Sequence, residues 1–165
     1  YNGVSIDMLL RMTVDDSIQF FRKYNQSKIV SKLLPLQSVG LGYVSLGQSS
    51  NTLSGGEAQR IKLASFIGKG DQIEKTFFIF DEPTTGLHFH DVRKLLNTFD
   101  KLIRMGHSIL VIEHNLDMIS CADHIIDLGP EGGDKGGEVI AEGSPEEIIK
   151  NKRSYTGQYL KSKIT

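Results

Sequence analysis

Two apolar runs and the segment between them most constrain how this chain folds. FFIF at residues 77–80 and SILVI at residues 108–112 are continuous apolar runs, as expected of strands that are covered on both faces. The segment from Phe89 to Met105 has the periodic mixture of apolar and charged residues that is typical of an amphipathic helix. A strand, a helix and a second strand in this order predict a parallel β/α/β unit, and therefore an α/β fold.

The chain before this unit is predicted to be mostly helical. Residues 1–40 read as a small helical subregion, in which Thr13 caps one helix and Pro35 breaks another. Residues 40–52 are rich in Gly and Ser and are predicted to be a connector. We therefore divide the chain into a helical subregion at residues 1–40 and a second part at residues 41–165.

Further elements are expected on either side of the β/α/β unit. A helix from Ser54 to about Ile67 precedes it, with a predicted buried face made of Ala58, Ile61, Ala64 and Ile67. After it we expect a short helix at 115–121, a strand at 124–128, a Gly-rich turn at 131–137, a strand at 138–143 and a helix that starts at Ser144. We expect these elements to complete the same unit.

Composition narrows the class of protein. The 165 residues carry 19 basic and 20 acidic side chains, and this balance gives no sign of a nucleic-acid or membrane surface. A single Cys121 cannot form an internal disulfide, which favours a reducing, cytosolic setting. No apolar run approaches the roughly 20 residues of a membrane span, so we expect a soluble, cytoplasmic protein. The first residue is Tyr1 rather than Met, which suggests a piece of a longer polypeptide.

The stretch LSGGEAQR at residues 53–60 starts its predicted helix with two residues that disfavour helices. Ser54 followed three residues later by Glu57 forms a capping box, and many proteins have one with no other role. Gly55 and Gly56 each cost up to about 0.8–1 kcal/mol relative to Ala, less in the first turn. Bare glycines at the positive end of a helix let an anion approach the backbone N–H groups. The stretch is therefore either a cap alone or a phosphate site.

Two carboxylates follow the first apolar run. Asp81 and Glu82 come directly after FFIF, and the ligands of open α/β sheets gather at the carboxyl ends of strands. One carboxylate there could hold Mg²⁺ while the other polarises an attacking water. The alternative is a simple polar exit from the strand. The second run is followed by Glu113 and His114, and this histidine could reach a phosphate or the water, although a lone His is more often structural.

The other histidines are weaker signals. His88 and His90 have no third ligand nearby in the sequence, and such pairs are more often surface residues than metal sites. We assign no role to His107 or His124.

Four motifs in this order resemble those of the ATP-binding-cassette (ABC) ATPases. LSGGEAQR resembles the signature of that family, FFIFDE at 77–82 its Walker B motif, TTGLH at 84–88 its D-loop, and His114 its switch histidine. Within this family, the chain resembles the branch that recognises DNA damage in bacterial nucleotide excision repair, and this resemblance extends over nearly the whole chain. The stretch LGPEGGDKGG at 128–137 distinguishes this branch from transporter cassettes. The resemblance implies a fragment of an ABC-type nucleotide-binding domain, with a P-loop NTPase-like parallel sheet and flanking helices.

The resemblance also implies a role for each matching residue. The residues that would contact the γ-phosphate of an ATP bound to an opposing cassette are Ser54, Gly55, Gly56 and Gln59. Asp81 would help to place Mg²⁺, Glu82 would activate the hydrolytic water, and His114 would sense or hold the γ-phosphate.

Two features of that branch are missing from the sequence. There is no G-x-x-x-x-G-K-[ST], the Walker A loop that wraps and neutralises phosphates, and there are no zinc-binding cysteines. We expect both upstream in a longer polypeptide, and we expect the chain alone to be inactive as an ATPase. The expected partners are the rest of that polypeptide with its other cassette, a second copy of the protein and, by resemblance only, duplex DNA.

Two other functions remain as alternatives. A cassette from another ABC ATPase would need a membrane partner in a transporter, or long heptad arms in a chromosome-maintenance protein, and the sequence indicates neither. A non-catalytic interaction module that kept the cassette shape would have no need for the pair Glu82 and His114.

Overall fold

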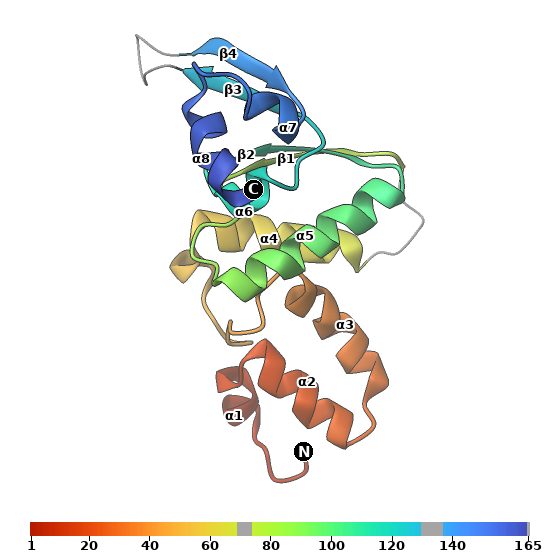
Figure 1. Cartoon of the computed structure of the whole chain (residues 1–165). Coiled ribbons are helices and arrows are strands. Elements are labelled where there is room, and N and C mark those ends of the chain that lie inside the picture. The colour runs from red at the N-terminus through yellow and green to blue at the C-terminus, as the bar shows by residue number, and fades with distance from the viewer. Residues whose placement is uncertain (69–73, 130–136, 165) are drawn as a thin grey trace. The chain divides into compact units, whose positions relative to one another are not determined.

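The computed structural model describes residues 1–68, 74–129 and 137–164, and the chain divides into two compact units (Figure 1). The first unit is Tyr1–Ile112 and the second is Glu113–Thr165. Each unit contains its own two-stranded sheet in the described residues.

Three helices begin the first unit. They are α1 (Ile6–Arg11), α2 (Val14–Lys23) and α3 (Ser27–Ser38). Thr13 caps α2 as predicted, because its hydroxyl oxygen accepts the N–H of Asp16 at 3.1 Å. A small core lies between α2 and α3, made of Val14, Ile18, Phe21 and Val30.

Pro35 lies inside α3 and does not break it, so the predicted break is wrong. The helix continues to Ser38 although a proline removes one backbone hydrogen bond. Leu36 packs against the core of α2 and α3, and its carbonyl accepts the N–H of Leu41 at 3.0 Å. Packing of the last turn therefore outweighs the cost of the proline.

The helix that follows Ser54 is α4 (Gly55–Ile67), preceded by a single 3-10 turn, η1 (Ser50–Thr52). Of its four predicted buried residues only Ala64 is fully buried, while Ala58, Ile61 and Ile67 are partly exposed. The positions that are fully buried are Gly56, Arg60, Leu63 and Ala64. The buried face is rotated relative to the predicted one. The prediction counted only apolar side chains, and it therefore left out Arg60.

A parallel pair of strands joined by one long helix forms the sheet of the first unit. β1 (Phe77–Asp81) pairs with β2 (Ser108–Ile112), with Phe77 opposite Ser108 and Asp81 opposite Ile112. The connecting helix is α5 (Phe89–Arg104). The predicted parallel β/α/β unit is therefore confirmed.

One face of this sheet is covered by helices of the first unit. The ring of Phe78 lies 4.7 Å from Phe66 of α4, and that of Phe80 lies 4.9 Å from Phe99 of α5. The side chains that point to the other face are at least 41% exposed; they are Phe77, Ile79, Leu110 and Ile112. Because α4 and α5 pack on the same face, the described part of the first unit covers only one of the two faces that were expected to be covered.

The second unit contains an antiparallel sheet. β3 (Ile125–Gly129) pairs with β4 (Glu138–Gly143), and the register is irregular between Asp127 and Leu128. The prediction that these strands complete the parallel unit is wrong, because the chain between them is shorter than the dozen or so residues that a parallel crossover needs. The predicted Gly-rich turn lies outside the described residues except for Gly137.

Three helices complete the second unit: α6 (Leu116–Ile119), α7 (Pro145–Ile148) and α8 (Tyr155–Ile164). α7 begins after the predicted Ser144 with its capping box. Helix α8 was not predicted from the sequence. Its first turn is held by Asp127 of β3, whose carboxylate accepts the hydroxyls of Ser154 at 2.5 Å and Thr156 at 2.7 Å.

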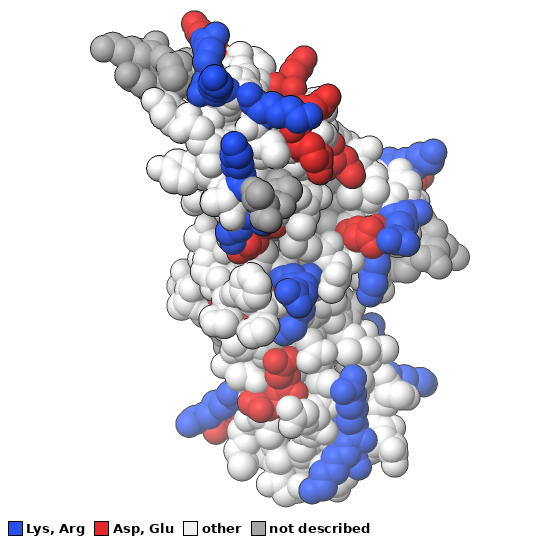
Figure 2. Space-filling view, viewed as in Figure 1, with Lys and Arg blue, Asp and Glu red and all other residues white. Residues whose placement is uncertain are grey.

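The surface carries both signs of charge. Figure 2 shows Lys and Arg side chains interspersed with Asp and Glu over the visible face. Among the helices in the described ranges, none is both long and apolar enough to cross a membrane.

Candidate functional site

The turn that leaves β1 carries the two predicted carboxylates. We call residues 81–86 the β1 turn. The N–H of Glu82 donates to the carbonyl of Ile112 at 2.9 Å, so the turn starts level with the end of β2. The N–H of Thr85 donates to the carbonyl of Glu82 at 3.1 Å and closes the turn. Asp81 and Glu82 therefore lie at the carboxyl end of the parallel sheet, as predicted.

Glu82 has a strained backbone. Its φ is +46°, in the left-handed region that favours glycine. A non-glycine residue held there costs on the order of 1–3 kcal/mol and persists only where its surroundings fix it. Such strain is concentrated at functional sites, and nothing in the local sequence predicts it.

The capping box at the start of α4 is formed as predicted. The Oγ of Ser54 accepts the N–H of Glu57 at 3.2 Å, and the Oε2 of Glu57 accepts the N–H of Ser54 at 2.7 Å. The hydroxyl of Tyr43 donates to the other carboxylate oxygen of Glu57 at 2.6 Å, and this bond lowers the pKa of Glu57 below its ordinary value. Helix geometry provides no acceptor for the amides of Gly55 and Gly56, which is the arrangement that suits an anion.

The two glycines of the signature stretch differ in their surroundings. A Cβ on Gly55 would meet nothing within 4 Å. A Cβ on Gly56 would lie 3.1 Å from Nη1 of Arg60 and 3.3 Å from the carbonyl oxygen of Thr85. Close packing against the β1 turn is therefore sufficient to explain Gly56. It does not explain Gly55, whose open side is accessible to a ligand.

Gln59 binds the end of β1. Its Nε2 donates to the carbonyl of Asp81 at 2.9 Å, and its Oε1 accepts the N–H of Asp81 at 3.2 Å. Gln59, which the family resemblance predicts to contact ATP, is thus hydrogen-bonded to the backbone of Asp81, the predicted Mg²⁺ ligand.

Arg60 also belongs to this site, although it was not predicted from the sequence. It is fully buried, and its Nη1 donates to the carbonyls of Pro83 at 2.6 Å and Thr85 at 3.3 Å. Burial lowers the pKa of the guanidinium, and the nearby Tyr43 and Glu57 partly oppose this effect. Its spacing of four residues from Gly56 places both on one face of α4, which is the signal that could have identified it.

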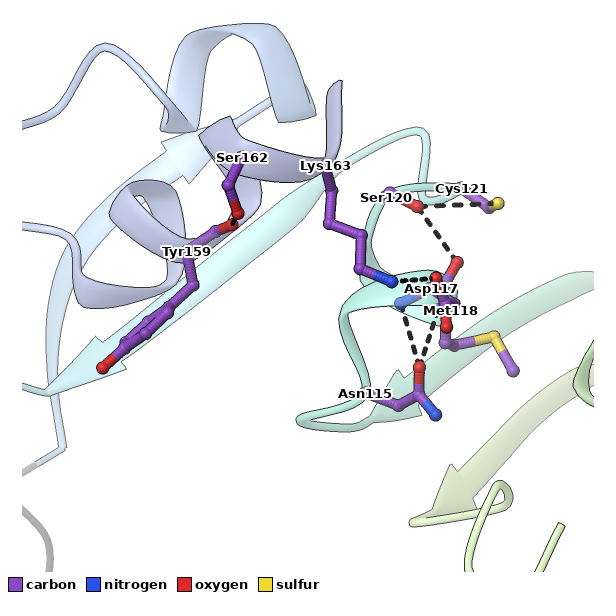
Figure 3. Close-up of polar contacts among 8 residues, drawn as sticks. All are labelled: Asn115, Asp117, Met118, Ser120, Cys121, Tyr159, Ser162 and Lys163. Carbon is purple, nitrogen blue, oxygen red and sulfur yellow. Dashed lines mark hydrogen bonds and ion pairs between the residues drawn. The ribbon is translucent and has the colours of Figure 1, made fainter. Parts of the chain in front are cut away.

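His114 lies at the start of the second unit. The Oε2 of Glu113 accepts the N–H groups of His114 and Asn115, both at 3.0 Å. Asn115 in turn caps α6 by accepting the N–H of Asp117 at 2.9 Å. Figure 3 shows this cap and the ion pair from Lys163 of α8 to Asp117, so the segment after His114 is tied to the last helix of its unit.

Of the remaining histidines, His88, His90 and His124 are exposed and His107 is buried. The rings of His88 and His90 stack at 5.5 Å. No group of three or more His, Cys, Asp or Glu side chains in the described part of the chain is arranged to hold a metal ion. His107 is buried, and its Nδ1 accepts the N–H of Thr76 at 3.1 Å.

The residues present fit part of a site for ATP and Mg²⁺. Mg²⁺ is commonly held by one or two carboxylates together with phosphate oxygens and water, so Asp81 and Glu82 at a strand end are a suitable protein contribution. The open side of Gly55 at the start of α4 is suitable for a phosphate.

Comparison with solved structures defines the class of protein. A bacterial Atm1-family ABC exporter with ATP bound is similar in fold, with a TM-score of 0.54 and 20% identity over 95% of this chain and 27% of that one. The crystal structure of UvrA2 from Deinococcus radiodurans is more similar, with a TM-score of 0.81 and 39% identity over 98% of this chain and 20% of that one. The chain thus has the fold of part of an ABC ATPase cassette.

Sequence comparison finds relatives of higher identity. UvrABC system protein A of Rhizobium meliloti is 56% identical over 161 residues, which are 98% of this chain and 16% of that protein. The same protein of Clostridium acetobutylicum is 56% identical over 164 residues, or 99% of this chain and 17% of that protein. The chain is similar to one segment of these proteins, and it spans about one sixth of their length. No family model matches the sequence.

Proposed function

We propose that this chain supplies half of each of two composite ATP sites in a UvrA-type ATPase that recognises DNA damage in bacterial nucleotide excision repair. The observation that carries the proposal is the direct contact between the signature stretch and the β1 turn, in a chain that is 56% identical to UvrABC system protein A over 98% of its length. In this proposal the start of α4 serves an ATP held by an opposing cassette, and the β1 turn serves the ATP of its own cassette.

Each predicted residue has a specific role in this proposal. Bound ATP and Mg²⁺ supply the phosphoanhydride and the positive charge that screens it. Ser54 and the amides of Gly55 and Gly56 hold the γ-phosphate from the opposing cassette, and Gln59 joins them if its amide leaves the backbone of Asp81. Asp81 contributes to Mg²⁺ binding, Glu82 orients the attacking water and accepts its proton, and His114 senses the γ-phosphate.

The chain alone is proposed to bind ATP poorly and to hydrolyse essentially none. Its sequence contains no Walker A loop, and therefore no lysine of that loop to neutralise the phosphates. The zinc of the family would likewise be held by residues outside this sequence.

We also propose that residues 1–40 form a helical subregion that is distinct in role from the signature, Walker B and switch-histidine part at residues 41–165.

The proposed partners follow from the UvrA resemblance. They are the rest of the polypeptide with its other cassette, a second UvrA subunit, UvrB and duplex DNA. The net charge of −1 and the mixed charges of the visible face in Figure 2 favour a weak contribution of this segment to DNA binding.

The alternatives are less well supported. The exporter cassette shares the fold at only 20% identity, which carries no transport function to this chain. A non-catalytic module would gain nothing from holding Glu82 at a φ of +46°.

The test is a full-length UvrA that carries this sequence. Glu82→Gln should retain ATP binding and reduce kcat by about 100-fold or more, since a positioned general base contributes that much. Glu142→Gln, an exposed change on β4, is the matched control and should leave kcat unchanged. Normal hydrolysis by the Glu82→Gln protein would show that the assigned base is wrong.

A further inference from the structure

Arg60 is buried at a cost that the nearby carboxylates of Glu57 and Asp91 offset only in part. Moving a guanidinium out of water costs several kcal/mol, and no carboxylate forms an ion pair with Arg60 in the described residues. Its Nε and Nη2 also have no hydrogen-bond partner in the described part of the chain. An apolar side chain of similar volume would fill the same space without this cost. The two carbonyls that accept from Nη1 are therefore the contacts that indicate a role for Arg60.

These carbonyls belong to the turn that carries Glu82. Pro83 and Thr85 lie on the C-terminal side of the strained residue, and Nη1 of Arg60 reaches both, at 2.6 and 3.3 Å. Since a left-handed glutamate persists only where its surroundings fix it, a donor shared by two carbonyls of the same turn is a suitable restraint.

Three residues of α4 contact the β1 turn from one face of the helix. Gly56 lies against the carbonyls of Glu82 and Thr85, Gln59 binds the backbone of Asp81, and Arg60 holds Pro83 and Thr85. Their spacing of three and four residues is that of neighbours on a helix surface. A displacement of the start of α4 therefore displaces the β1 turn as well.

We propose that Arg60 is a positioning residue that couples the start of α4 to Glu82, so that a nucleotide held at the signature stretch sets the position of the catalytic carboxylate that serves another nucleotide. This inference rests on the proposed function, because the two ends of the coupling are assigned there to different composite sites. Arg60 touches neither nucleotide. It acts through the backbone of the β1 turn.

The test compares Arg60→Met and Arg60→Lys in a full-length UvrA that carries this sequence. Methionine fills a similar volume and donates no hydrogen bond, so kcat should fall by about 10-fold to 100-fold, as expected for a misplacement of about 1 Å. KM for ATP should change by less than about 2-fold and the Hill coefficient should fall toward one. Lysine can reach one carbonyl, so its kcat should lie between those of Met and the parent. Arg104→Met, an exposed change on α5, is the matched control.

A second readout does not depend on ATP. Hydrogen exchange of the amides of Glu82, Thr84, Thr85 and Gly86 should speed up about 10-fold in Arg60→Met, with exchange in α5 unchanged, because the restraint is local. Unchanged kcat in Arg60→Met would overturn the coupling role, and unchanged exchange in the β1 turn would overturn the restraint on which it depends. If Arg60→Met does not fold, Arg60→Lys decides: parental kcat and cooperativity in that variant overturn the coupling role.

Failure of this inference is distinguishable from failure of the proposed function. If Glu82→Gln abolishes hydrolysis while Arg60→Met retains the parental kcat, the coupling role fails and the composite-site proposal stands. If Glu82→Gln hydrolyses ATP normally, the proposed function fails, and the exchange experiment still reports whether Arg60 restrains the turn.

Discussion

The hydroxyl of Tyr43 donates a 2.6 Å hydrogen bond to the carboxylate of Glu57, the residue that closes the capping box of α4. Tyr43 belongs to the predicted connector, 14 residues before Glu57. The bond therefore fixes the connector to the helix start that carries the signature glycines. It also favours the ionised form of Glu57, and so lowers the pKa of this carboxyl.

The first prediction concerns the pH dependence of this contact. A carboxyl whose pKa is lowered on folding adds stability above its ordinary pKa of 4.5, and this stability is lost as the pH falls through the lowered value. Tyr43→Phe should therefore reduce the free energy of unfolding at neutral pH. The reduction should be less than about 1 kcal/mol, because this hydrogen bond is exposed to solvent. The difference from the parent should shrink as the pH falls below 4.5.

Urea unfolding of the two proteins across this pH range measures the effect. Tyr159→Phe, in a ring that is 67% exposed, is the control and should match the parent at every pH. A difference between Tyr43→Phe and the parent that stays constant with pH would show that the ionisation of Glu57 is not involved.

The helix caps and the parallel pairing of β1 with β2 could be predicted from the sequence, whereas the pairing of β3 with β4 and the start of α8 were not. The caps at Thr13, Ser54 and Ser144 depend on residues three positions away, and all three are formed. The antiparallel pairing of β3 with β4 depends instead on a connection too short for a crossover. The start of α8 depends on Asp127, which lies 27 residues before Ser154.

The candidate site shows the same limit. The sequence places Asp81 and Glu82 at the end of β1, because an apolar run followed by acids marks a strand end. It does not reveal the left-handed backbone of Glu82 or the burial of Arg60, since both arise where α4 meets the β1 turn. Gly55 and Gly56 are identical in the sequence, and only their surroundings separate them.

The second prediction uses this difference between the glycines. In a full-length UvrA that carries this sequence, Gly56→Ala should lower stability by about 1–3 kcal/mol, because its Cβ crowds Arg60 and Thr85. Gly55→Ala should leave the melting temperature unchanged or slightly higher, since alanine favours a helix, but it should reduce kcat/KM for ATP by about 10-fold, the effect of losing about 1.4 kcal/mol of transition-state binding. Calorimetry and steady-state kinetics on both variants measure these effects. If Gly55→Ala hydrolyses ATP like the parent, the signature stretch is a helix cap alone.

The third prediction concerns the second unit. A Cβ on Gly157 would lie 2.3 Å from the carbonyl oxygen of Ile148, which is backbone and cannot move aside easily. Gly157→Ala should therefore destabilise this unit by about 3 kcal/mol, the upper part of the usual range for overpacking. Thermal unfolding followed by circular dichroism, with hydrogen exchange of α8, measures the loss. The exposed change Ser162→Ala in the same helix should stay within about 0.5 kcal/mol of the parent, and an equal effect of both changes would contradict close packing at Gly157.

The last prediction concerns DNA. The logarithm of DNA affinity falls linearly with the logarithm of salt concentration, and each phosphate contact made by Lys or Arg makes this fall steeper by about 0.9. The basic residues that lie closest together in this chain are Lys150, Lys152 and Arg153, all exposed. Because the segment carries a net charge of −1, we expect full-length UvrA with all three changed to Gln to keep the parental slope and its preference for damaged over undamaged duplex. Binding titrations of both duplexes at several salt concentrations measure this. A slope smaller by about 2.7 would show instead that all three side chains contact phosphates, and a parental protein with no preference for damage at any salt concentration would remove the repair role itself.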